Sequence, residues 1–417
     1  MPHAFLSSEP IPGNLLILLA GLWLAAKLGG ELALRLRLPA VAGELGAGMA
    51  IAFLHRQWPA LPDAGNSPAA ALLGSLGVIV LMFAVGLEST VPQMLRVGLA
   101  SLRVALAGVA LPILAGFGAA WVLLPGTANP TLWLFIGACL CATSIGISAQ
   151  VLRERRLAKS AEGRVIVGAA VIDDVLGLLV LVAVTASVRQ ADSGSMPWLG
   201  LGRTLGLALG FLALAFSLGR YATPQLFRLA SRLRSEQILL PASLGFAFLL
   251  AGLGSLAGLA PIVGAYSAGL ILEPAHIRVL EHRELHTLED LVRPLVVTLS
   301  PLFFVLMGAR VDPGLLLHGR TLVFALVLGL AATVGKFAAG KFAGRGLRAA
   351  VVGWGMVPRG EVGLIFVATG SALTLGGGPL LSAEVQAGVV GAIVMTTILG
   401  PIGLGLALKR AETVAAN

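Results

Sequence analysis

Charged residues are scarce in this sequence, and their scarcity limits the class of protein it encodes. Only 12% of its 417 residues are Asp, Glu, Lys or Arg, whereas 57% are hydrophobic, and the mean hydropathy is +0.94. A water-soluble protein needs polar faces on its helices. Here apolar runs of about 18 or more residues recur from end to end, which excludes a soluble globular domain and predicts membrane-spanning helices.

Cysteine is nearly absent. The two cysteines, Cys139 and Cys141, lie two positions apart in an apolar segment, where a helix directs them to different sides. The sequence therefore predicts neither a disulfide framework nor a zinc site. The first apolar run, Asn14 to Gly29, lacks a basic start and a small-residue cleavage site, so we interpret it as a retained membrane helix rather than a signal peptide.

The apolar runs predict an all-α polytopic membrane protein with about thirteen transmembrane helices. The expected spans are 13–30, 38–55, 70–88, 98–124, 131–152, 165–187, 198–219, 237–256, 259–273, 292–309, 321–342, 347–371 and 384–408.

Basic residues concentrate in alternate loops between these spans. The net charge of +9 arises from such loops, so membrane orientation explains it and no nucleic-acid partner is expected. By the positive-inside rule the basic side faces the cytoplasm, which places the N-terminus outside and the C-terminus in the cytoplasm. The opposite side has few basic residues, namely Arg56, Arg189, Arg203, Arg310 and Arg320.

The longest segment between spans, 273–293, mixes acidic and basic residues with leucines. This pattern predicts an amphipathic surface helix that acts as a linker, with a partner surface as the alternative. We expect no soluble domain after the last span, and hence no nucleotide-binding regulatory domain in this chain.

Two spans are interrupted at corresponding places. They lie seven spans apart, so a six-span unit repeated after a one-span linker would make them equivalent and inverted. This pattern is typical of inverted-repeat transporters, whose broken helices form a binding site near the middle of the membrane, although Gly and Pro are common in membrane helices generally. The fifth span is interrupted by Thr143, Ser144, Gly146 and Ser148, and the twelfth by Pro358, Arg359, Gly360, Glu361 and Gly363.

Two adjacent aspartates, Asp173 and Asp174, lie roughly 12–14 Å into the sixth span, close to the centre of a bilayer core about 30 Å thick. Ionisable side chains at this depth are costly and indicate function. Consecutive helix residues point about 100° apart, so one carboxylate can face a cavity while the other faces a neighbouring helix. A buried carboxylate binds a proton more readily and is also a hard ligand for a small cation, which is the minimal chemistry of antiport.

Other polar residues complete the candidate site. Lys336 of the eleventh span lies within reach of Asp173 and is expected to pair with it. Thr143 and Ser144 offer oxygen ligands around Asp174, or alternatively pack within their helix.

The charges at the second break, Arg359 and Glu361, are expected to compensate the ends of the broken helix rather than bind the ion. Glu44, about 9 Å into its span, is a secondary candidate. Glu88, near a span end, is another, although a structural role is favoured there, as it is for Lys27 and Glu31.

At these residues the sequence resembles the monovalent cation:proton antiporter-2 family, and within it the bacterial sodium/proton exchangers of the NapA type. The resemblance covers nearly the whole chain, and the aspartate pair with the Pro-Arg-Gly-Glu break is its most specific part. The matching stretches are LRLPAVAGELGAGMAIA, FAVGLE, ATSIGISAQVLRE, VGAAVIDDVLGLL, SPLFFVLMGARVD, VGKFAAGK and GMVPRGEVGLIF.

The resemblance implies a homodimer with a NhaA/NapA-like fold, in which two discontinuous helices cross. It implies a core domain at about 70–187 and 292–408 and a dimerisation domain at about 13–55 and 198–273. It also implies that Asp174 binds the cation and that Asp173 forms a salt bridge with Lys336, a lysine typical of electrogenic members.

The expected function is thus exchange of cytoplasmic Na⁺ or Li⁺ for external H⁺ by a secondary transporter, without enzymatic activity and without a cofactor. The alternatives are a potassium/proton antiporter and a sodium-coupled organic-solute symporter. A channel is disfavoured, because the sequence offers one compact charge cluster at mid-depth instead of a continuous polar path.

Overall fold

The computed structural model describes residues 13–36, 38–59, 61–88, 98–124, 129–155, 157, 160–193, 238–257, 259–272 and 287–416, with a few single positions between 206 and 225. Within these residues the protein is almost entirely helical. Eight of the described helices are long and apolar enough to cross a membrane. The expected span 198–219, apart from single positions, and residues 273–286 lie outside the described ranges.

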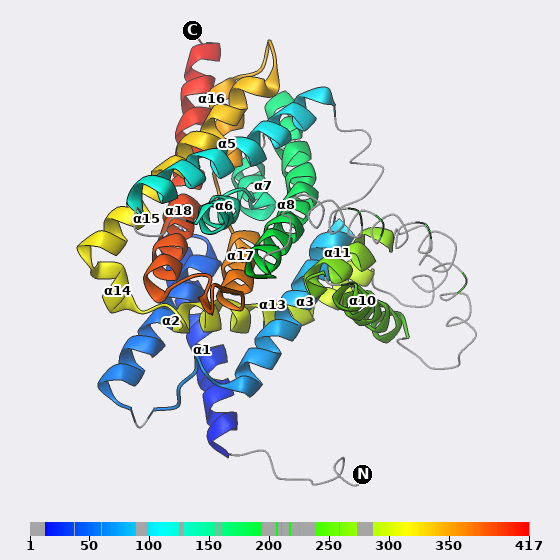
Figure 1. Ribbon diagram of the computed structural model, residues 1–417. Helices are drawn as coiled ribbons and strands as arrows, with labels where there is room; N and C mark the ends of the chain where they lie inside the picture. The colour runs from blue at the N-terminus through cyan, green and yellow to red at the C-terminus, as the bar shows by residue number, and fades with distance from the viewer. Residues whose placement is uncertain are drawn as a thin grey trace.

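Figure 1 shows the helices in chain order. They are α1 (Gly13–Arg35), α2 (Ala40–Gln57), α3 (Pro68–Glu88), α5 (Leu99–Leu123), α6 (Pro130–Cys139), α7 (Ile145–Glu154), α8 (Ala161–Ser193), α10 (Leu239–Leu256), α11 (Pro261–Ile271), α13 (Leu288–Ala309), α14 (Pro313–Leu317), α15 (Gly319–Ala339), the 3₁₀ helix η1 (Gly340–Ala343), α16 (Ala349–Met356), α17 (Glu361–Ser371) and α18 (Ala383–Ala416). A short hairpin follows α17, with β1 (Thr374–Leu375) antiparallel to β2 (Gly378–Pro379).

Every expected span that falls on described residues coincides with a helix. The span 131–152 is divided into α6 and α7, and the span 347–371 into α16 and α17. The expected surface segment 273–293 overlaps α13. Residues from Leu288 onward belong to that helix, because Thr287 and Asp290 form a capping box that starts it.

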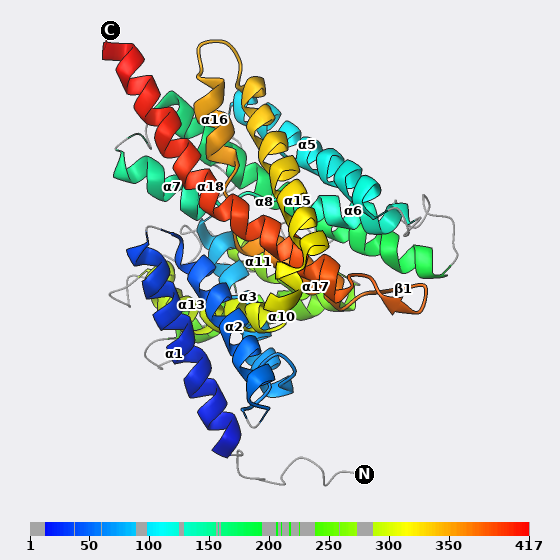
Figure 2. The same ribbon diagram turned by 90° about the vertical axis from the view of Figure 1, so that its left-hand side faces the viewer.

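The helices pack into two groups, which Figures 1 and 2 show on opposite sides of the molecule. The first group contains α1, α2, α3, α10, α11 and α13, and the second contains α5, α6, α7, α8, α15, α16, α17 and α18. This packing differs from the expected division, because segments 70–88 and 292–309 belong to the first group and not to the core. A methyl group on Gly77 of α3 would lie 2.4 Å from the Leu299 carbonyl of α13, so these two helices are in backbone contact.

Polar bonds also hold α1 against α13. Pro301 in α13 has no N–H, so the carbonyl of Val297 loses its helical donor. Lys27 of α1 donates to this carbonyl at 3.0 Å, and the indole of Trp23 donates to the Thr298 carbonyl at 2.8 Å. Lys27 therefore satisfies a carbonyl that Pro301 leaves without its helical donor, which is a structural role.

Candidate functional site

The paired aspartates lie in the interior of α8, the long helix that passes through the centre of the molecule (Figure 1). Asp173 is about 18 Å along the helix axis from its first residue, Ala161. The side chain of Asp173 is fully buried, and Asp174 is only 5% exposed. Because consecutive positions point about 100° apart, the two carboxylates face different neighbours.

Lys336 of α15 forms a buried ion pair with Asp173. Its Nζ donates to both carboxylate oxygens, at 2.9 and 3.0 Å, and neither side chain is exposed. The pairing expected from the sequence is therefore present. The neighbouring Gly335 makes it possible, because a side chain there would begin 2.8 Å from the backbone nitrogen of Pro112 in α5. Because Gly335 has no side chain, α15 packs closely on α5, and Lys336 lies inside the protein.

The two broken helices bind each other at their breaks. Gly360 in the second break has no side chain, and a Cβ there would lie 2.9 Å from Oγ of Ser144 in the first. Three bonds link the breaks: the Ser144 N–H donates to the Pro358 carbonyl at 2.8 Å, the Thr143 hydroxyl to the Met356 carbonyl at 3.2 Å, and the Ser148 hydroxyl to the Gly355 carbonyl at 2.6 Å. Carbonyls freed where α16 ends are thus satisfied by residues where α7 begins.

Arg359 places a positive charge between the two breaks. It is fully buried, and its Nη2 donates to the carbonyl of Leu140, the C-cap residue of α6. A cation at a helix C-terminus compensates the negative end of the helix dipole. The Arg359 carbonyl in turn accepts from the hydroxyl of Thr397 in α18 at 2.6 Å. Among the described residues, its Nε and Nη1 have no hydrogen-bond partner.

The breaks lie beside the aspartates. Gly177, one turn beyond Asp173 on α8, faces both breaks. A Cβ at Gly177 would lie 3.9 Å from Ala142, next to the first break, and 4.0 Å from Val362, next to the second. The structure therefore brings the Asp173–Lys336 pair together with Thr143 and Ser144, which are themselves buried.

The remaining predicted residues divide into two cases. Glu44 is 7% exposed but lies in α2, in the first group, away from the aspartate pair. Glu361 begins α17 and Glu88 ends α3, while their side chains lie outside the described part of the structure. Sequence reasoning did not select Thr397, although two adjacent threonines in an otherwise apolar last span are a signal that could have found it.

In the part of the chain that the structure describes, no three His, Cys, Asp or Glu side chains cluster as a metal site would require. The first break offers hydroxyl and backbone carbonyl oxygens, which are hard ligands suited to a small cation.

A cavity of about 520 Å³ lies between the two groups, at the end of α8 that carries Thr185 and Arg189. It is lined by α3, α10, α11 and α13 of the first group and by α8 and α17 of the second. Thr185 on α8 lines it, and its buried hydroxyl has no hydrogen-bond partner among the described residues. Water in the cavity would satisfy this hydroxyl.

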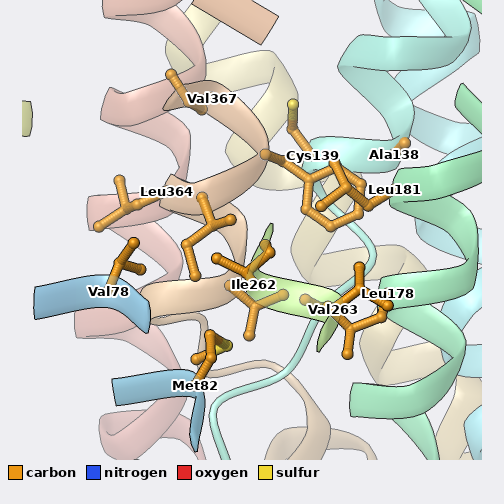
Figure 3. Packing of buried hydrophobic residues seen from close by; sticks show 14 of the residues in the cluster. Val78, Met82, Ala138, Cys139, Leu178, Leu181, Ile262, Val263, Leu364 and Val367 are labelled. Carbon is orange, nitrogen blue, oxygen red and sulfur yellow. The ribbon is translucent and has the colours of Figure 1, made fainter. Parts of the chain in front are cut away.

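An apolar layer separates this cavity from the aspartates. Figure 3 shows its side chains gathered from α3, α8 and α11. Leu178 lies one turn beyond Asp174, whereas Thr185 lies about 16 Å beyond it along the same helix. The layer is formed by Val78, Met82, Leu178, Leu181, Ile262 and Val263, all less than 9% exposed.

This arrangement defines a class of protein, a multi-pass helical membrane protein with a buried charge cluster at two broken helices. The chain belongs to the sodium/hydrogen exchanger family, because the family model described as the transmembrane sodium/hydrogen exchanger matches residues 16–410. Members of this family are secondary transporters and not enzymes. The resemblance seen in the sequence is confirmed at this level.

Individual relatives agree with this assignment. The chain is 33% identical to the high-affinity Na⁺/H⁺ antiporter NhaS3 of Synechocystis, over 96% of this chain and 91% of that protein. It is 32% identical to the Na⁺/H⁺-K⁺ antiporter GerN of Bacillus cereus, over 91% of this chain and 92% of that protein. The solved structure of the sodium proton antiporter MjNhaP1 from Methanocaldococcus jannaschii superposes with a TM-score of 0.72 at 21% identity, covering 95% of this chain and 99% of that one.

Proposed function

We propose that this protein is a sodium/proton antiporter that exchanges cytoplasmic Na⁺ or Li⁺ for external H⁺ at Asp174 and Asp173. The observation that carries the proposal is the fully buried Lys336–Asp173 ion pair beside a second carboxylate and two broken helices. A carboxylate removed from water holds either a proton or a hard cation, and competition between them couples the two fluxes.

The residues have distinct roles in this proposal. Both oxygens of Asp173 accept from Lys336, so Asp174 is the carboxylate that meets the incoming cation. Thr143 and Ser144 supply further oxygen atoms at the first break. Arg359, together with Glu361, compensates the charge of the helix ends, and no cofactor is required.

Transport proceeds by alternating access. The second group carries the aspartates and the two broken helices, which cross as in inverted-repeat transporters. During transport this group moves against the first group. The cavity and the apolar layer beneath it support this scheme, because they lie where the two groups meet. The protein has thirteen spans in a bacterial inner membrane, with its N-terminus outside, and forms a homodimer through the first group.

The cycle is electrogenic in this proposal. Sodium entering beside Asp174 displaces Lys336 from Asp173, and an ammonium without its counter-ion in a dry site releases its proton more readily. Each turn then returns more protons than the sodium ions it exports.

Potassium is a second candidate for the exported cation, because the name of the Bacillus cereus relative includes K⁺ beside Na⁺. Proteoliposomes loaded with either salt distinguish the two ions, since the preferred ion drives proton flux at the lower concentration.

The proposal is tested by Asp174→Asn, which keeps the size of the side chain but removes its charge. We expect this variant to remain folded and dimeric and to lose sodium-driven proton movement in proteoliposomes. Near-normal exchange by Asp174→Asn would show that this carboxylate does not bind the ion.

A further inference from the structure

Arg359 has hydrogen-bonding capacity that its described contacts do not use. A guanidinium carries five N–H donors in a fixed planar arrangement. Among the described residues only its Nη2 has a partner, the carbonyl of Leu140, whereas Nε and Nη1 have none. The side chain is fully buried, and a buried donor without a partner is costly. Two such donors on one side chain beside a transport site therefore require an explanation.

The guanidinium lies near the ion pair of the transport site. Arg359 interacts electrostatically with both Asp173 and Lys336. The surroundings of Gly108 in α5 agree, because a Cβ there would lie 3.5 Å from Nζ of Lys336 and 3.7 Å from the terminal methyl of Met356. Met356 ends α16, three positions before Arg359. The lysine amine thus packs against the same break that carries the arginine.

Asp173 has room for a second donor. A carboxylate offers about four lone-pair sites, and Lys336 uses one on each oxygen. The two cations also differ in chemistry. Lysine can lose its proton in a buried site, whereas arginine stays charged and binds carboxylates well. Arg359 is therefore suited to hold Asp173 while Lys336 is away from it.

We propose that Arg359 is the second counter-ion of Asp173, and that its free donors bind this carboxylate when Lys336 leaves it during transport. This inference rests on the proposed function, in which sodium at Asp174 displaces the lysine. The exchange of partners keeps the buried carboxylate compensated at a step that would otherwise leave it isolated.

The direct test is a structure of Lys336→Met determined by electron cryo-microscopy without sodium. Methionine is similar in length to lysine but has neither charge nor donor, so this variant imitates departure of the lysine. A guanidinium nitrogen of Arg359 should then lie within hydrogen-bonding distance of Asp173, about 2.7–3.2 Å. Lys336→Gln, which retains a donor, is the second variant.

A double-mutant cycle on thermal stability measures the same contact in solution. In the Lys336→Met background, Arg359→Gln and Asp173→Asn are made singly and together, and melting temperatures are measured in sodium-free detergent. Arg359→Gln should lower the melting temperature by about 2 °C or more beyond its effect in the presence of Asp173→Asn.

Thr397→Val is the matched control. The Thr397 hydroxyl donates to the Arg359 carbonyl at 2.6 Å, so valine loosens the second break but leaves the guanidinium in place. In Lys336→Met, the effect of Thr397→Val on the melting temperature should be the same with and without Asp173→Asn.

The inference is overturned if Arg359 stays away from Asp173 in the structure of Lys336→Met, for example because Glu361 binds the guanidinium. It is also overturned if the cycle shows no coupling, or if Thr397→Val couples to Asp173 as strongly as Arg359→Gln does. These measurements need no transport. Absence of sodium/proton exchange in wild type is therefore a separate result, which contradicts the proposed function itself.

Discussion

Both oxygens of Asp173 accept from the Lys336 ammonium, so the negative charge of this carboxylate is already compensated before a cation arrives. Removing one partner of a buried ion pair typically costs about 3–5 kcal/mol. When Lys336 leaves Asp173, sodium, a proton or another positive charge must therefore compensate the carboxylate, and the lysine must lose its proton or find another partner. At the scale of single residues, the proposed cycle therefore links the charge of the Asp173–Lys336 pair to what occupies Asp174.

Competition at Asp174 predicts a pH dependence. As pH falls, protons occupy the carboxylate and the apparent affinity for sodium weakens. As pH rises, the carboxylate is ionised and the affinity reaches a limit. Direct sodium-binding measurements between about pH 5 and 9 should show this trend in wild type. A constant affinity over this range would indicate separate sites for sodium and protons.

Lys336→Gln tests whether the lysine carries a proton during the cycle. Glutamine retains length and hydrogen-bonding ability but cannot titrate, so we expect slower exchange that no longer generates current. One elementary charge across 100 mV is worth about 2.3 kcal/mol, so the wild-type rate should depend on voltage. Solid-supported-membrane electrophysiology measures the current.

Dye-detected proton flux is the control, because it shows whether Lys336→Gln still turns over. An undiminished sodium-evoked current per turnover in this variant would mean that the lysine has only a structural role.

At the scale of elements, the hydroxyl groups at the first break hold the two broken helices together. Ser148→Ala removes the donor to the buried Gly355 carbonyl, and an unsatisfied buried group costs about 1–3 kcal/mol. We expect a lower melting temperature in detergent and slower exchange. Ser371→Ala is the matched control, because its hydroxyl bonds only within α17 in the described contacts, to the Val367 carbonyl. Equal effects of the two substitutions would show that the link between the breaks is unimportant.

The sequence predicts the helices better than it predicts which helices pack against each other. Long apolar runs identify spans, and Asp173 with Lys336 is predictable because a buried charge requires a partner. The placement of α3 is not, since a helix that is apolar on all sides has no polar face to show what it packs against. The bond from Lys27 to the Val297 carbonyl also escapes prediction, because it depends on how α1 packs against α13.

At the scale of the whole molecule, the cavity predicts relative movement of the two groups. Ser75 of α3 and Thr369 of α17 line it from opposite groups, whereas Ser75 and Ser255 belong to the same group. In a Cys139→Ala, Cys141→Ala background that retains exchange, Ser75→Cys with Thr369→Cys should lose transport when bridged by bifunctional thiol reagents, and regain it on reduction.

The same reagents applied to Ser75→Cys with Ser255→Cys should leave exchange largely intact. Continued transport by the pair bridged across the groups would contradict alternating access through this cavity.

The bonds between the two breaks also have a consequence for biosynthesis. Leu140 and the arginine that binds its carbonyl are 219 residues apart in the chain. At about 5–20 residues per second, a ribosome needs about 10–40 seconds to make the intervening segment. Lipid cannot hydrogen-bond the open backbone of the first break during that interval. The nascent helix must therefore stay in contact with water or with the insertion machinery until its partner emerges, so the first half of the protein reaches its final place in the bilayer only after the second half has been translated.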